Sequence, residues 1–216
     1  MTDPLTGRLG ACYSGVVHDI MRGMGLRNFT LPHDITPLMP ETALCGPAFT
    51  IEGRPDDAAD AHETLLQWTG LLSKAKSGHI WVCQPHTDDI ALMGELSAET
   101  LQKKGVLGCV LDGLARDTHF LMDIGFQTLR RGHTPKDIVG RWLPIAAEQP
   151  IQIGDVRIEN GDYLIGDRDG MVRVPRAIAE DVTAKSIEAM QTENSVRTAI
   201  MDGVDPQEAY LKYGKF

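Results

Sequence analysis

Residues 94–117 read GELSAETLQKKGVLGCVLDGLARD, and this stretch decides how the rest of the chain is interpreted. Residues 95–104 show a helical pattern, and the apolar run 106–111 is typical of a strand that is buried in a sheet. Such a strand carries the residues that follow it to the rim of the sheet, where binding sites are built. We therefore expect Arg116 and Asp117, at the end of the stretch, to lie at such a rim.

The side chains at the two ends of this stretch suit a small acidic ligand held beside a metal ion. Arginine binds carboxylates through two parallel hydrogen bonds, and aspartate is an oxygen ligand for divalent cations. Glu95 and Ser97 stand where the expected helix begins, and free backbone N–H groups at such a position favour an anion. The alternative is an ordinary surface ion pair between Arg116 and Asp117, with Glu95 merely complementing the helix dipole.

The spacing of these residues resembles a known signature. Twenty residues separate Glu95 from Arg116-Asp117, which is similar to the signature of the 4-hydroxy-4-methyl-2-oxoglutarate aldolases of the RraA-like family. The resemblance runs roughly from Ser14 to Phe216. It includes further short motifs that fall where the family has similar ones, namely Gly125-Phe126, Arg131-Gly132-His133-Thr134-Pro135, Gly161-Asp162-Tyr163, Asp167-Arg168-Asp169-Gly170 and Val174-Pro175.

The resemblance implies an architecture and an assembly. The family fold is an α/β, swivelling β/β/α domain that resembles the phosphohistidine domain and has a mixed sheet, so residues 1–216 are expected to form a single RraA-like domain. Members assemble as homotrimers, sometimes paired into homohexamers, with the active site at subunit boundaries.

The resemblance also implies a reaction. It points to a divalent-metal-dependent class II pyruvate aldolase that cleaves substrates of the 4-hydroxy-4-methyl-2-oxoglutarate or 4-carboxy-4-hydroxy-2-oxoadipate type to pyruvate and a second 2-oxo acid. Oxaloacetate decarboxylation passes through the same pyruvate enolate, and Mg²⁺ or Mn²⁺ would stabilise the developing oxyanion. A Schiff-base lysine is the rival chemistry, but no lysine stands in an obviously apolar stretch. The sequence leaves open which 4-hydroxy-2-oxo acid is the substrate and which metal is preferred.

Specific roles follow from the resemblance for four charged residues. Arg116 would bind the pyruvyl carboxylate and the C2 oxygen, and Asp117 would be the direct metal ligand. Glu95 would hold a metal-bound water. Glu193 matches the glutamate that a neighbouring subunit contributes in the family.

The backbone at the start of the expected helix is the remaining part of the implied site. Gly94 and the amides of Leu96 and Ser97 would receive the substrate carboxylate. The family commonly has leucine where Ser97 stands, although only its amide is needed. Many relatives have an acid where this chain has Phe120.

The same resemblance also allows a second class of function. Some members are non-enzymatic regulators of ribonuclease E activity that bind protein partners. Those members typically have glycine where this chain has Glu95, so Glu95 favours the enzyme.

Composition limits the partners and the compartment. The chain has 216 residues, of which 42% are hydrophobic, and its formal charge of −9 argues against a nucleic-acid surface. Residues 1–10 have no apolar core, so no signal peptide is expected, and no run is long enough to span a membrane. We expect a cytoplasmic protein in which the four cysteines are reduced, buried thiols: Cys12, Cys45, Cys83 and Cys109.

Hydrophobic periodicity predicts alternating strands and helices, hence parallel strands with helical crossovers, up to about residue 149. Short alternating segments beyond Pro150 predict a small antiparallel unit, followed by a long helix with Pro175 at its first position. The expected helices are 14–24, one opening at Asp56-Asp57 and closed by Gly78, 118–124, 175–201 and 205–213. The expected strands are 48–52, 79–83, 106–111, 126–129, 151–153, 156–158, 163–165 and 171–174.

Two further groups of polar residues have no assigned role. His86, Asp88 and Asp89 lie in a loop after an expected strand, and a basic cluster at residues 130–133 precedes Thr134-Pro135. His86, Asp88 and Asp89 are residue types that could bind a metal directly, but we expect them at most to support the site from behind its ligands. The basic cluster suits either a solvated turn or a contact that helps to neutralise a di-acid substrate.

Overall fold

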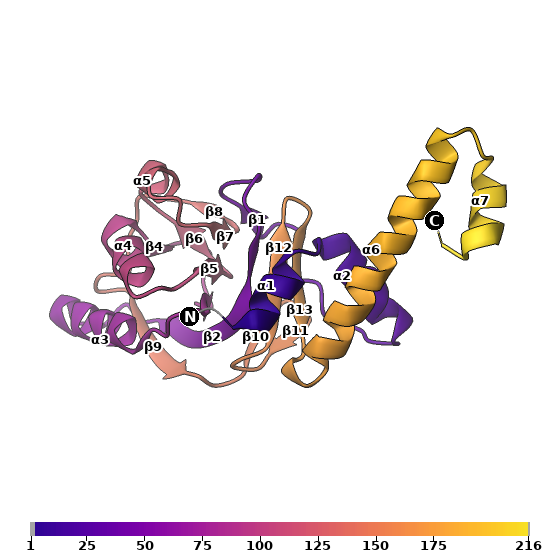
Figure 1. The fold of residues 1–216 in the computed structure, drawn as a ribbon. Coiled ribbons are helices and arrows are strands. Elements are labelled where there is room, and N and C mark those ends of the chain that lie inside the picture. The colour runs from indigo at the N-terminus through magenta and orange to yellow at the C-terminus, as the bar shows by residue number, and fades with distance from the viewer. Residues whose placement is uncertain (1–2, 216) are drawn as a thin grey trace.

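The structure is a computed structural model that describes residues 3–215, and a mixed sheet flanked by helices forms its body (Figure 1). The helices are α1 (Pro4–Gly10), α2 (Ser14–Gly23), α3 (Ala61–Lys74), α4 (Glu95–Lys103), α5 (Thr118–Asp123), α6 (Ala179–Met201) and α7 (Pro206–Tyr213), with a short 3₁₀ turn, η1 (Arg176–Ile178), before α6. The strands are β1 (Thr36–Pro37), β2 (Leu44–Pro55), β3 (Ile80–Gln84), β4 (Ala91–Met93), β5 (Gly108–Leu111), β6 (Leu114–Ala115), β7 (Thr128–Arg130), β8 (Gly132–His133), β9 (Trp142–Ala147), β10 (Ile151–Ile153), β11 (Val156–Ile158), β12 (Tyr163–Asp167) and β13 (Gly170–Val174).

The main sheet has the strand order β1-β7-β5-β3-β2-β12-β13, and β9 pairs with the far part of the long strand β2. Strands β7, β5, β3 and β2 are parallel, whereas β1, β9, β12 and β13 pair antiparallel with their neighbours. The predicted α/β class with a mixed sheet is therefore confirmed.

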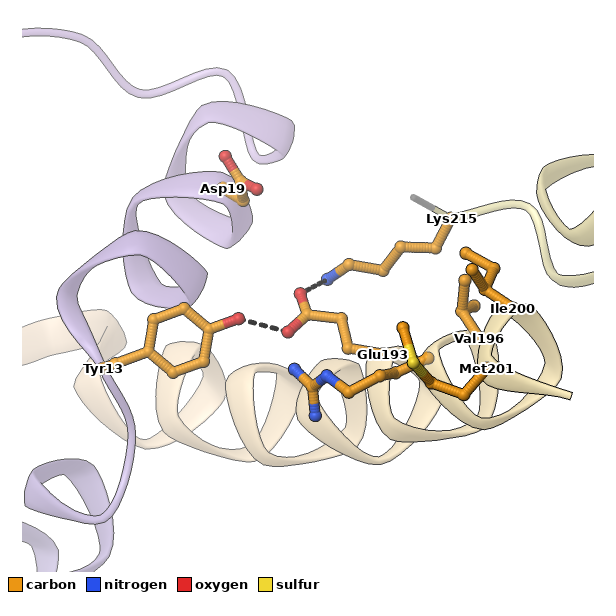
Figure 2. Close-up of a pocket in the computed structure, with 8 residues that line it drawn as sticks. Tyr13, Asp19, Glu193, Val196, Ile200, Met201 and Lys215 are labelled. Carbon is orange, nitrogen blue, oxygen red and sulfur yellow. Dashed lines mark hydrogen bonds and ion pairs between the residues drawn. The ribbon is translucent and has the colours of Figure 1, made fainter. Parts of the chain in front are cut away.

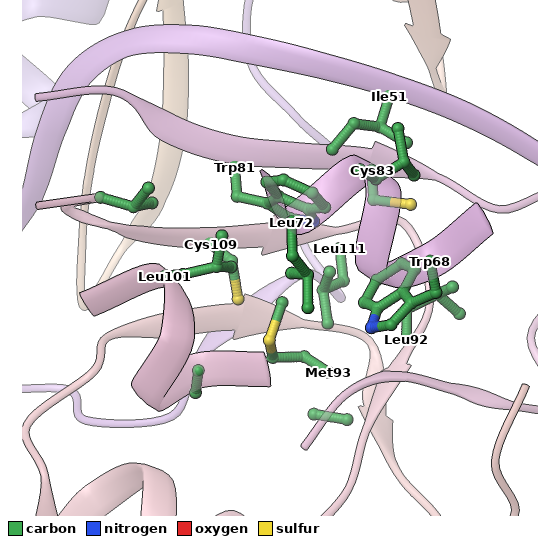
Figure 3. Packing of buried hydrophobic residues seen from close by; sticks show 14 of the residues in the cluster. Ile51, Trp68, Leu72, Trp81, Cys83, Leu92, Met93, Leu101, Cys109 and Leu111 are labelled. Atoms are coloured by element: carbon green, nitrogen blue, oxygen red, sulfur yellow. The ribbon is translucent and has the colours of Figure 1, made fainter. Parts of the chain in front are cut away.

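The two faces of the sheet carry separate cores because side chains alternate along each strand. In β3, Trp81 and Cys83 face the cluster formed with α3 and α4, which Figure 3 shows around Trp68 and Leu72. Ile80 and Val82 face the opposite side, where the β10–β11 hairpin covers the sheet. A third cluster joins α1, α2 and the start of α6 to β12 and β13. Burial of these apolar side chains is the main force that holds the layers together.

A second, three-stranded sheet positions the candidate site. Strands β4, β6 and β8 are parallel, and Ala91 pairs with Leu114 while Met93 pairs with Ala115. The residues that follow β4 and β6 therefore leave the sheet side by side. Arg116-Asp117 follow β6 rather than the buried strand 106–111, which corrects the expectation that this strand delivers them directly.

The C-terminal strands pair antiparallel, as predicted, but they do not form one unit. The hairpin β12–β13 extends the main sheet because β12 pairs with β2, and only β10–β11 stands apart as a two-stranded sheet. Local alternation predicts each strand but not its partner, since pairing joins segments far apart in sequence.

Several element boundaries also differ from prediction. Strand β2 continues to Pro55, so α3 starts only at Ala61, where the Asp60 side chain accepts hydrogen bonds from the backbone of the first turn. Pro175 precedes the 3₁₀ turn, and α6 itself begins at Ala179. Helix α1 and strands β1, β4, β6, β8 and β9 were not predicted, because most are too short to show a period.

Strand β9 packs through a close contact between Trp142 and Gly53 that no sequence pattern predicts. The Trp142 ring lies against Gly53, where any side chain would overlap it, next to a bulge between Glu52 and Gly53.

No helix among residues 3–215 has the length and apolar character needed to cross a bilayer. All four cysteines are free; Cys45 is only partly buried and the others are buried.

Candidate active site

The loops after β4 and β6 meet through backbone contacts. Gly94 is the N-cap of α4, and Glu95 is its first residue, as predicted. The Arg116 N–H donates to the Met93 carbonyl (2.8 Å), and the Glu95 N–H donates to Asp117 Oδ2 (3.2 Å). The N-terminus of α4 therefore faces the Asp117 carboxylate, an arrangement that the helix dipole favours.

Arg116 lies between two carboxylates. Its Nε is 3.4 Å from Asp117 Oδ2 and its Nη1 is 3.3 Å from Asp137 Oδ2. The three side chains are 38%, 38% and 41% exposed respectively. Ion pairs this exposed contribute little to folding, so they orient the guanidinium while leaving it open to a ligand.

The close packing of this group requires a glycine at position 94. A Cβ at Gly94 would lie 2.6 Å from Asp117 Oδ2 and 3.0 Å from both Cγ and Nε of Arg116. The backbone of Gly94 has φ −142°, which any residue can adopt. The glycine is therefore needed for space beside the ion pair and not for its backbone freedom.

Asp117 adopts a strained backbone conformation. Its φ of 53° lies in the left-handed region, which non-glycine residues seldom occupy. Asp117 is the N-cap of α5, yet its side chain makes no capping hydrogen bond to that helix and turns instead to α4. Strain of this kind collects at functional sites, where the surrounding structure holds it.

A hollow of about 370 Å³ opens beside Arg116. Its walls come from α3, β4, the first turns of α4, the Arg116-Asp117 loop and the loop after β8. The lining residues are Leu65, Trp68, Thr69, Leu72, Ala91, Leu92, Met93, Gly94, Glu95, Leu96, Ser97, Thr100, Arg116, Asp117, Asp137, Ile138 and Val139. All six residues implied for the site within one subunit are among them.

A smaller hollow of about 210 Å³ lies on the other side of the Arg116–Asp117 pair. His133 lines it together with Thr118, Thr134 and Pro135. Of the basic cluster 130–133, only His133 reaches the site. Arg130 donates to the Thr36 carbonyl, and Arg131 pairs with Asp112 and Asp34, so both brace the sheet edge.

The Ser97 hydroxyl has a structural contact of its own. It accepts a hydrogen bond from the buried Trp68 indole Nε1 (3.0 Å), which ties the first turn of α4 to α3. A leucine at this position could not accept that bond. The serine that stands here in place of the family's leucine therefore makes a hydrogen bond with Trp68 that leucine could not make.

The loop His86, Asp88 and Asp89 lines neither hollow. His86 Nε2 is 2.9 Å from Glu52 Oε1, and Asp89 pairs with Lys136. The Lys136 carbonyl also accepts the N–H of Ala91 (2.8 Å). Asp89 thus helps to hold the loop that carries Asp137. His86, Asp88 and Asp89 themselves line neither of the two hollows beside Arg116.

Asp137 is the site residue that sequence reasoning missed. It follows Thr134-Pro135 in a loop with no periodic pattern, and its Oδ1 also accepts the N–H of Val139 (3.2 Å). Only its position shortly after the Arg131–Pro135 motif hints at a role.

The donor set around Asp117 fits a magnesium-type ion with many water ligands. Both contacts of Asp117 use Oδ2, which leaves Oδ1 for a cation within the described part of the chain. Residues 3–215 contain no cluster of three or more His, Cys, Asp or Glu side chains arranged to hold a metal. A closed cage of the zinc type is therefore not built here, whereas Mg²⁺ is commonly held by one or two carboxylates plus water and substrate.

Glu193 lies on α6, which Figure 1 places on the opposite side of the molecule from α4 and α5. Figure 2 shows it between the Tyr13 hydroxyl and Lys215, whose Nζ is 2.7 Å from its Oε1. Burial raises the pKa of Glu193, but the bonds from Lys215 and Tyr13 outweigh it, so its pKa lies below the ordinary value. Within one subunit, Glu193 does not line the Arg116 hollow.

Comparisons with known proteins give a family and relatives. The sequence model of the RraA-like family, described as Aldolase/RraA, matches residues 15–173. A Halalkalibacterium halodurans protein provisionally named a 4-hydroxy-4-methyl-2-oxoglutarate aldolase is 28% identical over 87% of this chain and 85% of that protein. Protein DlpA of Legionella pneumophila is 23% identical over 94% of this chain, which spans only 32% of its length.

Solved structures share the architecture. Streptomyces coelicolor RraAS2, described as an unusual member of the RNase ES inhibitor RraA protein family, has a TM-score of 0.79 and 25% identity over 90% of this chain and 96% of that one. A structure described under novel cellulases from microbes associated with the gut ecosystem has a TM-score of 0.83 and 31% identity over 90% of both chains. The expected fold is therefore confirmed.

Proposed function

The chain belongs to the RraA-like family, and from this premise we propose that it is a divalent-metal-dependent carbon–carbon lyase. The proposed reaction is aldol cleavage of a 4-hydroxy-2-oxo acid, of the 4-hydroxy-4-methyl-2-oxoglutarate type, to pyruvate and a second carbonyl compound. Decarboxylation of oxaloacetate is the proposed side activity. The similarity to the Halalkalibacterium halodurans protein supports the aldolase assignment.

The observation that carries this proposal is the meeting of Arg116, Asp117 and the N-terminus of α4 at one hollow. A guanidinium and free helix N–H groups suit the carboxylate and 2-oxo group of a pyruvyl unit. A half-exposed aspartate with one oxygen uncommitted suits Mg²⁺ or Mn²⁺.

Each residue has a distinct part in the proposed mechanism. Asp117 would hold the metal, which supplies a Lewis acid when bound. Arg116 orients the substrate carboxylate and stabilises the negative charge that grows on its C2 oxygen. The N–H groups of Leu96 and Ser97 bind the same carboxylate, and Glu95 would hold a water that belongs to the bound metal.

Measurement of pyruvate release tests this function directly. The purified protein is incubated with a panel of 4-hydroxy-2-oxo acids and with oxaloacetate, with Mg²⁺, with Mn²⁺ and with neither. We expect metal-dependent release of pyruvate and metal-dependent exchange of the pyruvate methyl protons with D₂O. If no compound is cleaved and no exchange occurs with either metal, the protein is not a pyruvate lyase.

Gly94→Ala offers a steric test of the site. The added methyl group would push Asp117 and Arg116 apart without straining the backbone. Because displacements of about 1 Å can cost roughly 100-fold in rate, we expect a loss of about 10- to 100-fold in kcat/KM for cleavage. The control is Gly7→Ala, since nothing lies within 4 Å of a Cβ at Gly7. Equal activity of the two variants would contradict the role of the Arg116–Asp117 pair.

From the family resemblance, we propose that the assembly is a homotrimer or a multiple of it. Glu193 does not line the hollow of its own subunit, so it would join the Arg116 site from a neighbouring one. Light scattering on active protein is expected to give three subunits or six. Glu193→Gln should lower the rate of cleavage without changing the mass. A fully active monomer would refute both the assembly and this role of Glu193.

The second candidate function is regulation of a ribonuclease through protein contacts. The observation in its favour is the structural similarity to RraAS2 of Streptomyces coelicolor. Glu95 at the first position of α4 argues for the lyase instead, since the regulators typically have glycine there. The regulator becomes the better assignment only if the panel assay shows no lyase reaction.

A further inference from the structure

We propose that Tyr13 and Lys215 are positioning residues for the active site of a neighbouring subunit, because they hold the Glu193 carboxylate in one orientation. The inference rests on the proposed lyase function and on the part proposed there for Glu193. It adds two residues from opposite ends of the chain, and neither lines the Arg116 hollow of its own subunit.

The Glu193 carboxylate has a partner on each of its oxygens. The Tyr13 hydroxyl donates to Oε2, and Lys215 Nζ lies 2.7 Å from Oε1 (Figure 2). A glutamate on a helix surface otherwise samples several rotamers, whereas bonds to both oxygens select one. The side chain is only 19% exposed. Each oxygen keeps a second lone pair, which a water or a substrate hydroxyl can use.

The start of α2 fixes the Tyr13 side chain. Tyr13 is the N-cap of α2, and the next residue, Ser14, donates both its N–H and its hydroxyl to the Asp167 carboxylate, each at 2.7 Å. These bonds tie α2 to the turn between β12 and β13. The Tyr13 ring lies over Gly15, where a Cβ would come within 3.3 Å of it. The motif at residues 167–170 therefore helps to direct the Tyr13 hydroxyl toward α6.

The C-terminal segment brings Lys215 back to the same helix. Helix α7 packs on α6, and its Ala209 is fully buried. Gly214 ends α7 with a φ of 67°, and its N–H bonds the carbonyl four residues back (2.8 Å). Glycine adopts this left-handed conformation without strain, and it turns the chain toward Glu193. The terminal helix thus has a role in delivering a cation to that carboxylate.

The electrostatics of this group keep Glu193 ionised. Burial opposes ionisation, but the bonds from Lys215 and Tyr13 outweigh it and hold the pKa of Glu193 below its ordinary value. Burial and the bond to Glu193 raise the pKa of Tyr13 to about 12, so its phenol keeps the proton that it donates. The other charged residues of this hollow, Asp19 on α2 and Arg197 on α6, shift the pKa of Tyr13 in opposite directions. An ionised glutamate with a low pKa is a fixed acceptor of hydrogen bonds and a weak base.

Tyr13→Phe and Lys215→Met each remove one of the two contacts. We expect each to lower kcat for cleavage by roughly 3- to 10-fold with little change in KM, because Glu193 is present but less well oriented. Neither should cost more than Glu193→Gln, and neither should cost anything further when combined with it. The matched controls are Tyr210→Phe and Lys212→Met on α7, which are exposed, lie outside this hollow and should keep the parental rate.

Mixed assemblies test whether Tyr13 serves a neighbouring subunit. When Arg116→Ala subunits are co-expressed with Tyr13→Phe subunits, about a quarter of the sites combine an intact Arg116 with an intact Tyr13. We therefore expect the mixed protein to exceed the mean rate of the two pure variants by about twofold or more. Glu193→Gln mixed with Arg116→Ala should behave in the same way. Tyr13→Phe mixed with Glu193→Gln should give only the mean, since both changes lie on the same side of the subunit boundary.

The outcomes separate this inference from the function on which it rests. Parental kcat in Tyr13→Phe and Lys215→Met, beside a clear loss in Glu193→Gln, overturns the inference alone. So does a loss of rate that comes with a changed mass in light scattering or a lower melting temperature, since the contacts are then merely structural. If Glu193→Gln keeps the parental rate or fails to complement Arg116→Ala, the part proposed for Glu193 is wrong and the inference is wrong with it. A parent that releases no pyruvate overturns the lyase function as well.

Discussion

Asp117→Asn is expected to remove nearly all lyase activity while leaving the fold intact. Asparagine has the same shape and tolerates the left-handed backbone at φ 53°. Its carbonyl oxygen can still accept the Glu95 N–H that Asp117 Oδ2 accepts now. What the substitution removes is the negative charge that would hold a divalent cation.

The expected loss follows from the chemistry that the metal supplies. Lewis-acid stabilisation is worth several kcal/mol, and each 1.4 kcal/mol or so corresponds to about tenfold in rate, so we expect a loss of roughly 100-fold or more. Steady-state pyruvate release measures it, and excess EDTA should reduce the parent protein to the same level. The control is Asp57→Asn, because Asp57 is an exposed acid that lines neither hollow. Full activity of the parent in excess EDTA would rule out the metal mechanism.

Arg116→Lys is expected to slow aldol cleavage and oxaloacetate decarboxylation by similar factors. Arg116 uses its Nε toward Asp117 and its Nη1 toward Asp137, an arrangement that depends on the planar fork of the guanidinium. Lysine keeps the charge but cannot hold both neighbours and a substrate carboxylate together. Both reactions pass through the same enolate, so the same stabilising interaction is lost from each.

The size of the expected rate loss in Arg116→Lys depends on how exposed the Arg116 side chain is. Arg116 is 38% exposed, and its hydrogen bonds are therefore weaker than fully buried ones. A hydrogen bond to a charged group is worth about 1.5–3 kcal/mol, which corresponds to roughly 10- to 150-fold in kcat. The control is Arg157→Lys, at an exposed arginine on β11 that pairs with Glu159. Loss of cleavage with full retention of decarboxylation would place the two reactions at different sites.

Local sequence determined the parts of this protein that depend on neighbouring residues. The helical period after Gly94 places Glu95 at the first position of α4. The resemblance of the spacing between Glu95 and Arg116-Asp117 to a family signature implied a joint site, and the structure brings them to one hollow. Short alternating segments predicted the strands β10 to β13. Helix starts and strand alternation follow from steric and hydrogen-bonding preferences within a few residues.

The tertiary structure decided everything that depends on which segments pair. Parallel pairing of β4 with β6 sets Gly94 beside Asp117, and pairing of β12 with β2 merges the C-terminal hairpin into the main sheet. Packing of α3 against α4 brings Leu65 to the hollow, and the loop after β8 brings Asp137 to Arg116. No local pattern encodes these contacts, because their energy comes from apolar burial and backbone pairing between segments far apart in the chain.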